Sequence, residues 1–161
     1  MKKGSYFFLL LIMTSMLSCS TQKNTWLSRH FHQMQTKYNI QYNGRKAYND
    51  GLEAINEAHE DDFSTILPLY PISDHEAAKA ATSHMDRAIE KCRKSIKLHS
   101  IKVRPKKINP DKRRRDPKYK AWLQQEEFNE ELSKAWLLLA QSEFHKGDFL
   151  GSISTFNYVA R

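Results

Sequence analysis

Apolar residues recur along most of this chain at the spacing of amphipathic helices. An α-helix turns once in 3.6 residues, so positions three and four apart share a face. Four such faces can be followed: Leu27, Phe31, Met34 and Tyr38; Tyr48, Leu52, Ile55 and Ala58; Ala78, Ala81, Met85, Ala88, Ile89, Cys92 and Ile96; and Tyr119, Trp122 and Leu123. No segment shows the two-residue alternation of a strand, and the pattern therefore predicts an all-α fold.

The boundaries of these helices follow from turn-forming residues. The segment YNIQYNG is expected to break the first helix, with Asn43 and Gly44 forming a tight turn before a second helix from Arg45 to Ala58. Ser73 and Glu76 have the spacing of a capping box and predict a long helix that reaches about Leu98.

Prolines mark two further segments. DDFSTILPLYPISD is too irregular for a helix and too rich in proline for a central strand, so we expect a loop. Its apolar residues would cover a neighbouring helix: Ile66, Leu67, Leu69 and Tyr70. Asp116 and Pro117 form a suitable start for the last helical region, which covers residues 117–161.

The amino terminus has the pattern of an export signal. Lys2 and Lys3 precede an apolar run of 12 residues, Tyr6 to Leu17. This length fits the roughly 7–15 residues of a signal peptide and is short of the roughly 20 that span a bilayer. Ser18-Cys19-Ser20 then resembles the lipobox of bacterial lipoproteins, in which the signal is cut before a cysteine that carries a diacylglyceryl group. Residues 1–18 are therefore predicted to be a lipoprotein signal peptide, Cys19 the lipid attachment site and residues 19–25 a lipidated tether; a plain signal peptide with an incidental cysteine is the alternative.

Positive charge is concentrated in one segment. The chain has a net charge of +8, and residues 101–120, with ten basic and two acidic residues, account for all of it. Residues 101–116 read as a basic, proline-containing connector after an N-terminal helical region, 26–100. Its candidate docking patch is Lys106, Lys107, Lys112, Arg113, Arg114 and Arg115. An exported protein meets no cytoplasmic nucleic acid, so a solvated loop, or a strip that docks an acidic partner or anionic lipid headgroups, is expected instead.

Residues that could carry chemistry are present but do not form a recognisable catalytic motif. Cys92 lies on an apolar stripe, where a buried small side chain is expected. His59 with Asp61 and Asp62 could hold a metal, although loop residues before a turn explain the same cluster. The chain contains no phosphate-binding loop, HExxH or nucleophile elbow. We therefore expect a protein that is not an enzyme, without a metal or any cofactor besides the covalent lipid on Cys19.

The segment 134–161, KAWLLLAQSEFHKGDFLGSISTFNYVAR, resembles a tetratricopeptide repeat (TPR), a pair of antiparallel helices. Gly147 is expected to take a left-handed conformation at the turn and Asp148 to cap the second helix. The positions that match the packing pattern of the repeat are Ala135, Trp136, Leu139, Ala140, Phe144, Gly147, Asp148, Phe149, Ser152, Ile153, Phe156 and Val159. Because one repeat cannot bury its own face, either the preceding helices complete the stack or the chain is the front of a longer protein, which we favour.

Several segments together resemble the amino-terminal part of the PorW/SprE family of lipoproteins from Bacteroidota. They are the lipobox, NTWLSRHFHQMQTKYNIQYNGRKAYNDGLEAI, DDFSTILPLYPISD, MDRAIEKCRKSIKLHSI, RRDPKYKAWL and the closing repeat. The resemblance implies a TPR protein of the type IX secretion system, tied to gliding motility in gliding species. It also implies an outer-membrane anchor and a role between the PorK/PorN ring complex and the outer-membrane translocon. Relatives are much longer, with further repeats.

The residues after Cys19 and the tryptophans bear on location and on an alternative function. Surface-exposed lipoproteins of these bacteria typically resemble one another in having acidic residues soon after the cysteine, and residues 20–24 contain none, which favours the periplasmic leaflet of the outer membrane. A glycan-binding lipoprotein like the SusD group is the alternative function. Its aromatic candidates are Trp26, Trp122 and Trp136, which the helical pattern instead places in the core.

Overall fold

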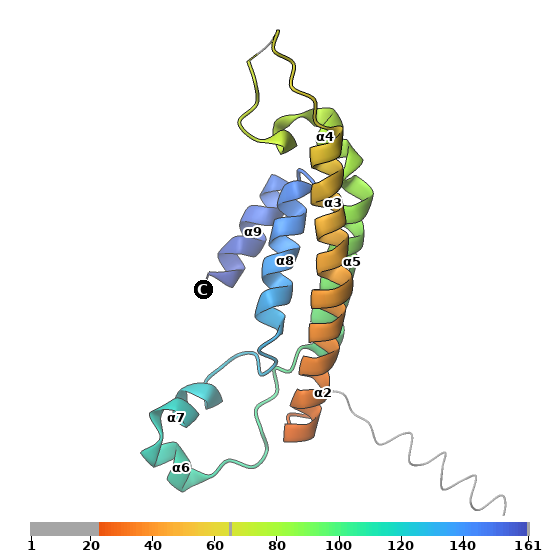
Figure 1. Cartoon of the computed structure of the whole chain (residues 1–161). Helices are drawn as coiled ribbons and strands as arrows, with labels where there is room; N and C mark the ends of the chain where they lie inside the picture. Colours follow the sequence, from red (N-terminus) through yellow and green to blue (C-terminus); the bar gives the residue numbers. More distant parts are fainter. Residues whose placement is uncertain (1–22, 65, 161) are drawn as a thin grey trace, which may run out of the picture.

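A computed structural model describes residues 23–64 and 66–160 of the protein. The elements in chain order are α2 (Trp26–Lys37), the π-helical segment η1 (Tyr38–Gly44), α3 (Arg45–Ala58), the 3₁₀ turn η2 (Pro71–Ser73), α4 (His75–Ala80), α5 (Thr82–His99), α6 (Pro110–Arg115), α7 (Pro117–Leu123), α8 (Leu132–His145) and α9 (Phe149–Val159). Every regular element of the described residues is helical, which confirms the predicted all-α fold (Figure 1).

The first two predicted helices form one continuous rod. The break expected at YNIQYNG is wrong, because η1 carries the helix from α2 into α3 without a turn. Gly44 has a right-handed helical backbone and is buried. A Cβ at this position would lie 3.2 Å from Cδ2 of Leu138, which is in α8. The glycine therefore allows two helices to approach closely, and it does not make a turn.

The predicted long helix after Ser73 is divided. Asp74, not Ser73, is the N-cap of α4, and its carboxylate accepts a hydrogen bond of 3.0 Å from the Glu76 N–H. The helix is interrupted at Ala81, whose ψ of −9° lies outside the regular α-helical value, and α5 starts directly afterwards. Ala81 is itself fully buried, and the packing of its neighbours continues across the interruption.

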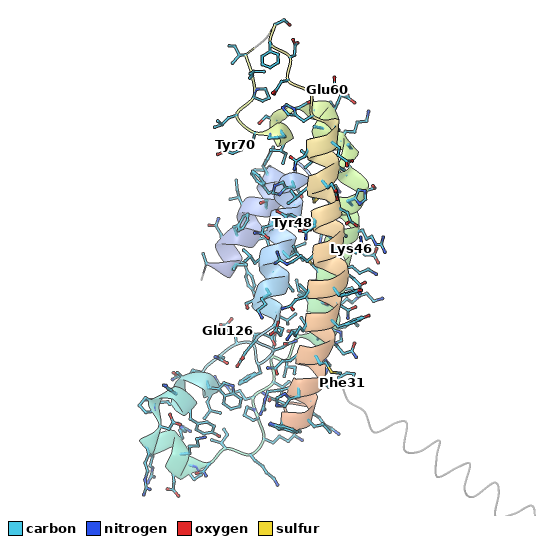
Figure 2. The ribbon with its side chains drawn as sticks, in the orientation of Figure 1. Phe31, Lys46, Tyr48, Glu60, Tyr70 and Glu126 are labelled. Atoms are coloured by element: carbon cyan, nitrogen blue, oxygen red, sulfur yellow. The ribbon has the colours of Figure 1, made fainter. Side chains whose placement is uncertain are left out.

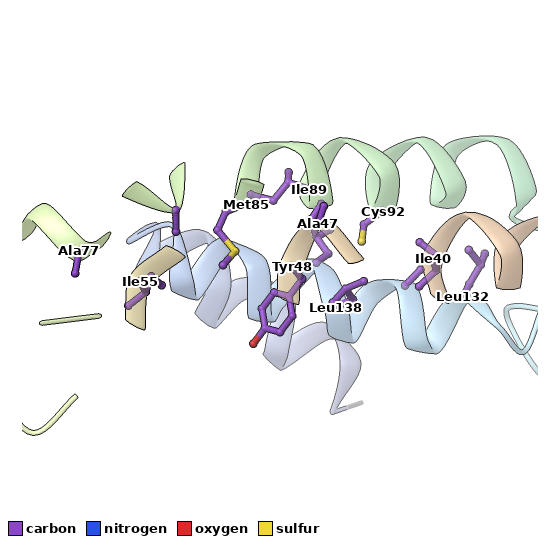
Figure 3. Close-up of a cluster of buried hydrophobic side chains, with 14 residues drawn as sticks. Ile40, Ala47, Tyr48, Ile55, Ala77, Met85, Ile89, Cys92, Leu132 and Leu138 are labelled. Atoms are coloured by element: carbon purple, nitrogen blue, oxygen red, sulfur yellow. The ribbon is translucent and has the colours of Figure 1, made fainter. Parts of the chain in front are cut away.

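The hydrophobic core lies among α3, α5 and α8, with α4 extending it at one end (Figure 3). Small residues on α5 and α8 let the helices approach, and larger side chains fill the space between them. The buried cluster consists of Ile40, Ala47, Tyr48, Ile55, Ala77, Ala81, Met85, Ala88, Ile89, Cys92, Leu132, Ala135, Leu138 and Leu139. Most of the predicted face of the long helix, from Ala81 to Cys92, is thus confirmed as core.

Helix α2 turns the apolar face of its sequence pattern to solvent. Its apolar residues Leu27, Phe31, Met34 and Tyr38 are exposed, whereas His32 and Thr36 are buried against the body. The buried side packs on a polar cluster: the Asn129 side-chain amide donates to Thr36 Oγ1 and to the His99 carbonyl, each at 2.9 Å. His32 Nδ1 lies 2.9 Å from His99 Nδ1. These hydrogen bonds give α2 a polar inner face.

The loop before α4 projects from one end of the rod (Figure 1). The sequence predicts that its residues Ile66, Leu67, Leu69 and Tyr70 cover a neighbouring helix, and this prediction is wrong, because all four are exposed. Ile66 is 98% exposed and Phe63 82%, and Leu67, Leu69 and Tyr70 are exposed as well. At the base of the loop, His59 contacts Asp61 and Asp74, with ring nitrogen to carboxylate oxygen distances of 3.2 and 3.3 Å.

The basic connector lies at the opposite end of the rod, together with the start of α2 (Figure 1). The sequence predicts an extended or turn-rich loop here, but part of the connector is helical: the Asn109 side chain caps a short helix, α6, by accepting from the Asp111 and Lys112 N–H groups. Helix α7 begins at Pro117 as predicted, with Asp116 as its N-cap. The connector is attached to the segment just before α2, where the Asn24 side chain donates to the Val103 carbonyl at 2.7 Å.

Candidate interaction surface on the C-terminal hairpin

Helices α8 and α9 form a hairpin whose turn is fixed by Gly147 and Asp148. Gly147 has the predicted left-handed backbone, with a φ of +88°. Its N–H donates to the Phe144 carbonyl, and the Asp148 N–H donates to the Glu143 carbonyl, each at 3.0 Å, which is the Schellman arrangement at the end of α8. Asp148 then caps α9 by accepting from the Gly151 N–H at 3.0 Å. The turn is thus built by the two residues that the sequence indicated.

Small residues close the two helices on each other. Ala135 and Ala140 are fully buried, Leu139 is nearly so, and Trp136 packs against the core cluster. Ser152 is also buried, and its hydroxyl donates to the Ala140 carbonyl at 3.0 Å. This bond satisfies the buried hydroxyl and places α9 on α8.

A buried carboxylate also fastens α9 to the body, which the sequence reasoning missed. Glu143 on α8 is 3% exposed. Its Oε1 lies 2.9 Å from Arg93 Nη2 of α5, and its Oε2 accepts from the Thr155 hydroxyl of α9 at 2.7 Å. A single acidic residue within the otherwise uncharged run AWLLLAQSEF was the available signal, because a charge in such a position needs partners.

The remaining predicted packing positions of the hairpin face solvent. Phe149 and Ile153 are more than half exposed, and Phe144, Phe156 and Val159 are also exposed. Leu150, which the repeat pattern did not include, is 83% exposed. We call these six residues the hairpin face. Two ring contacts lie within the hairpin: the ring centroids of Phe144 and Phe149 are 5.5 Å apart, and those of Trp136 and Tyr158 are 4.6 Å apart. Within the described residues the hairpin therefore packs on one side and is open on the other.

A cavity of about 410 Å³ lies between α3, η2 and the end of α8, near this hairpin face. Its lining is mainly apolar and consists of Leu52, Ile55, Asn56, Tyr70, Pro71, Ile72, Phe144 and His145. Phe144 belongs to both the cavity and the hairpin face. An apolar side chain of a bound protein could enter here without burying a charge, since no carboxylate, lysine or arginine lines it.

All six residues of the predicted basic docking patch, in the connector, are exposed. None of the ion pairs between described residues involves them. Lys112 Nζ lies 5.1 Å from the centre of the Tyr119 ring, and Arg29 of α2 lies 5.0 Å from that of Trp122. These contacts hold α6 and α7 near α2 and leave the positive charge available to solvent.

The other candidate groups are accounted for by packing. Burial raises the pKa of the Cys92 thiol to about 12, with Glu143 adding to the effect, so the thiolate is disfavoured. His59 contacts Asp61 as predicted, but the second carboxylate at its imidazole is that of Asp74. Asp62 instead accepts from the Ser64 N–H and hydroxyl. In the described part of the chain, no three metal-ligating side chains are grouped so that they could hold a metal ion.

The three tryptophans that are candidates for glycan binding differ in exposure and in their contacts. Trp26 is 68% exposed, contrary to the core position expected for it, and its ring contacts His30. Trp122 packs against Phe128 and Arg29, and Trp136 lies against Tyr158. The three tryptophans belong to α2, α7 and α8, and only Trp26 presents most of its surface to solvent.

Cys19 and the predicted signal peptide, residues 1–18, lie outside the described residues. Among the described helices, none combines the length and the apolar content needed to cross a bilayer. Compared with known proteins, the chain matches no protein-family model and no curated protein. A functional assignment therefore rests on the residues and geometry of this chain and on the resemblance of its sequence segments.

Proposed function

We propose that this protein is a non-enzymatic scaffold lipoprotein of the type IX secretion system, anchored by Cys19 in the periplasmic leaflet of the outer membrane. In this role it links the PorK/PorN ring complex to the outer-membrane translocon, and contributes to gliding motility in species that glide. The sequence segments that resemble the PorW/SprE family support the system, and the lipobox supports the anchor. No metal or nucleic acid takes part.

The observation that carries a scaffold role is the open hairpin face. Leu150, Ile153 and Phe149 present large apolar side chains on a helix whose opposite side is already packed. Contiguous exposed apolar surface of this kind marks a site for protein contact. In TPR solenoids such a face is covered by the next helical hairpin or by a partner. Helical surfaces bind by shape and burial and need no catalytic group.

Deletion and variant analysis in a secreting host tests this proposal. We expect deletion of the gene to block export of type IX cargo, and the tagged wild-type protein to co-purify with ring or translocon components. Leu150→Glu with Ile153→Glu would place two charges on the hairpin face and should abolish the co-purification. Phe63→Glu with Leu69→Glu makes the same change in the exposed loop and is the matched control. Normal cargo export in the deletion strain, or equal loss of partners in both variants, would contradict the proposal.

A SusD-like glycan-binding lipoprotein is the second candidate, and the exposure of Trp26 favours it. An exposed indole can stack on a sugar ring, but the other two tryptophans are engaged in ring contacts within the protein. A glycan-binding screen with the wild type and Trp26→Ala distinguishes the two candidates. Glycan binding that disappears in Trp26→Ala, without co-purification of secretion components, would select this second function.

A further inference from the structure

Helix α2 and η1 carry a continuous apolar stripe on their outer side. It consists of Leu27, Phe31, Met34, Tyr38 and Tyr42, and we call it the α2 stripe. Each of its side chains is at least 50% exposed, and Leu27 reaches 71%. Figure 2 shows Phe31 at the outer side of the rod. At 1.5 Å per residue the stripe is about 22 Å long, so it is a linear face and not an isolated exposed side chain.

The charged residues of the segment that carries the α2 stripe all have the same sign. The first acidic residue of the entire chain is Asp50, in α3. Between Cys19 and Asp50 there are five basic residues: Lys23, Arg29, Lys37, Arg45 and Lys46. Lys37 and Arg45 are exposed beside the stripe and at its end. A helix with an apolar face, basic flanks and no acidic residue has the composition of a helix that lies in an anionic membrane interface.

The position of the stripe in the chain favours the same occupant. Only six residues separate Cys19 from Trp26, and a fully extended chain of that length reaches about 25 Å. If Cys19 carries the lipid, as the proposed function requires, α2 is held within this distance of the bilayer. The loop at the other end of the rod and the hairpin face have no such constraint. Trp26, exposed at the start of α2, is of the residue type that prefers the headgroup region.

We infer that α2 and η1 lie along the membrane surface, with the α2 stripe in the interface of an anionic phospholipid leaflet. The lipid on Cys19 and the stripe then form two linked attachments, which fix the direction of the rod as well as its distance from the bilayer. The basic connector is not part of this contact. Arg29, which contacts Trp122 of α7, is two residues from Leu27 and therefore about 200° around the helix from it. The connector and the hairpin face stay free for protein partners.

Vesicle binding by the mature chain without its lipid tests this inference. Residues 20–161 retain every described residue and lack both the signal peptide and Cys19. We expect binding to vesicles of phosphatidylethanolamine and phosphatidylglycerol, measured by co-sedimentation, and little binding to phosphatidylcholine. Phe31→Glu with Met34→Glu should weaken the binding by about tenfold or more, because apolar area is lost and like charges approach the anionic surface. High salt should weaken it as well.

The matched control is again Phe63→Glu with Leu69→Glu in the loop, which should bind as the wild type does. Far-ultraviolet circular dichroism and thermal melting establish that both variants remain folded, as expected for substitutions of exposed residues. Equal binding by the wild type and the stripe variant would overturn the inference. A wild-type dimer that the stripe variant dissociates, without vesicle binding, would also overturn it by assigning the stripe to a second copy. The assay contains no secretion component, so either result leaves the scaffold proposal to its own test.

Discussion

Helices α2 and α3 belong to one rod, yet they present opposite kinds of side chain to the body of the protein. Helix α3 buries Ala47, Tyr48 and Ile55 in the hydrophobic core. Helix α2 buries His32 and Thr36 and leaves its apolar stripe in solvent. No turn separates them, because η1 continues the helical backbone.

The difference lies in the surfaces on which the two helices pack. Helix α3 lies against apolar residues of α5, among them Met85 and Ala88. Helix α2 lies against the end of α5 and the segment before α8, where the buried Asn129 and the His99 carbonyl require hydrogen bonds. Polar groups removed from water need such partners, and α2 supplies them. The side of the rod that is buried therefore depends on the groups against which each helix packs.

The largest effect expected from this comparison is on the free energy of unfolding when an apolar side chain is shortened in each helix. Ile55→Ala in α3 should lower it by about 2–5 kcal/mol, because a buried side chain is replaced by a cavity. Leu27→Ala in α2 removes a similar volume from an exposed position and should change it by less than about 0.5 kcal/mol. Urea unfolding of both variants measures the difference. A comparable loss in Leu27→Ala would mean that the α2 stripe is part of the fold and not a free surface.

The turn and cap of the C-terminal hairpin and the buried face of α5 could be predicted from the sequence. Asp148 and Gly147 act through short-range hydrogen bonds and backbone conformation, so their roles can be inferred from neighbouring residues. The face of α5 was predicted for a similar reason, since Met85, Ala88 and Cys92 follow helical spacing and meet apolar surfaces on both sides. Helical periodicity therefore predicts the buried residues correctly when the apolar side of a helix is also the side that packs on the body of the protein.

Periodicity was misleading where tertiary contacts decided the outcome. The stripe of α2 has regular helical spacing, but the buried positions are set by the distant Asn129 and His99. Gly44 suggested a turn, and only its proximity to Leu138 shows why a glycine is needed within a helix. On the hairpin face, the spacing of Phe149 and Ile153 indicated a shared apolar side of α9. The exposure of that side depends on what packs on α9 and could not be read from the spacing.

A second, smaller effect should distinguish the polar inner face of α2 from an ordinary surface hydrogen bond. Asn129→Ala removes the amide that donates to Thr36 Oγ1 and to the His99 carbonyl, and leaves both groups buried without it. We expect the free energy of unfolding to fall by about 1–3 kcal/mol. Asn39→Ala removes the same side chain from a bond to the Gln35 carbonyl within the α2–η1 rod, where water can replace it, and should have little effect. Equal losses of unfolding free energy in the two variants would show that the hydrogen bonds of Asn129 contribute no more than an ordinary surface hydrogen bond.

The smallest expected effect is a dependence of stability on pH that comes from the same seam. Burial lowers the pKa of His99, and the charge of neighbouring His32 lowers it further. The unfolded chain therefore takes up a proton on His99 before the folded chain does, as the pH falls below about 6.5. This contribution is fully present above that pH and should be lost progressively below it. Urea unfolding between neutral and mildly acidic pH should show the decline, and His99→Gln should reduce its slope. An unchanged slope in this variant would assign the pH dependence to other groups, while a reduced slope would locate it where α2 meets the end of α5.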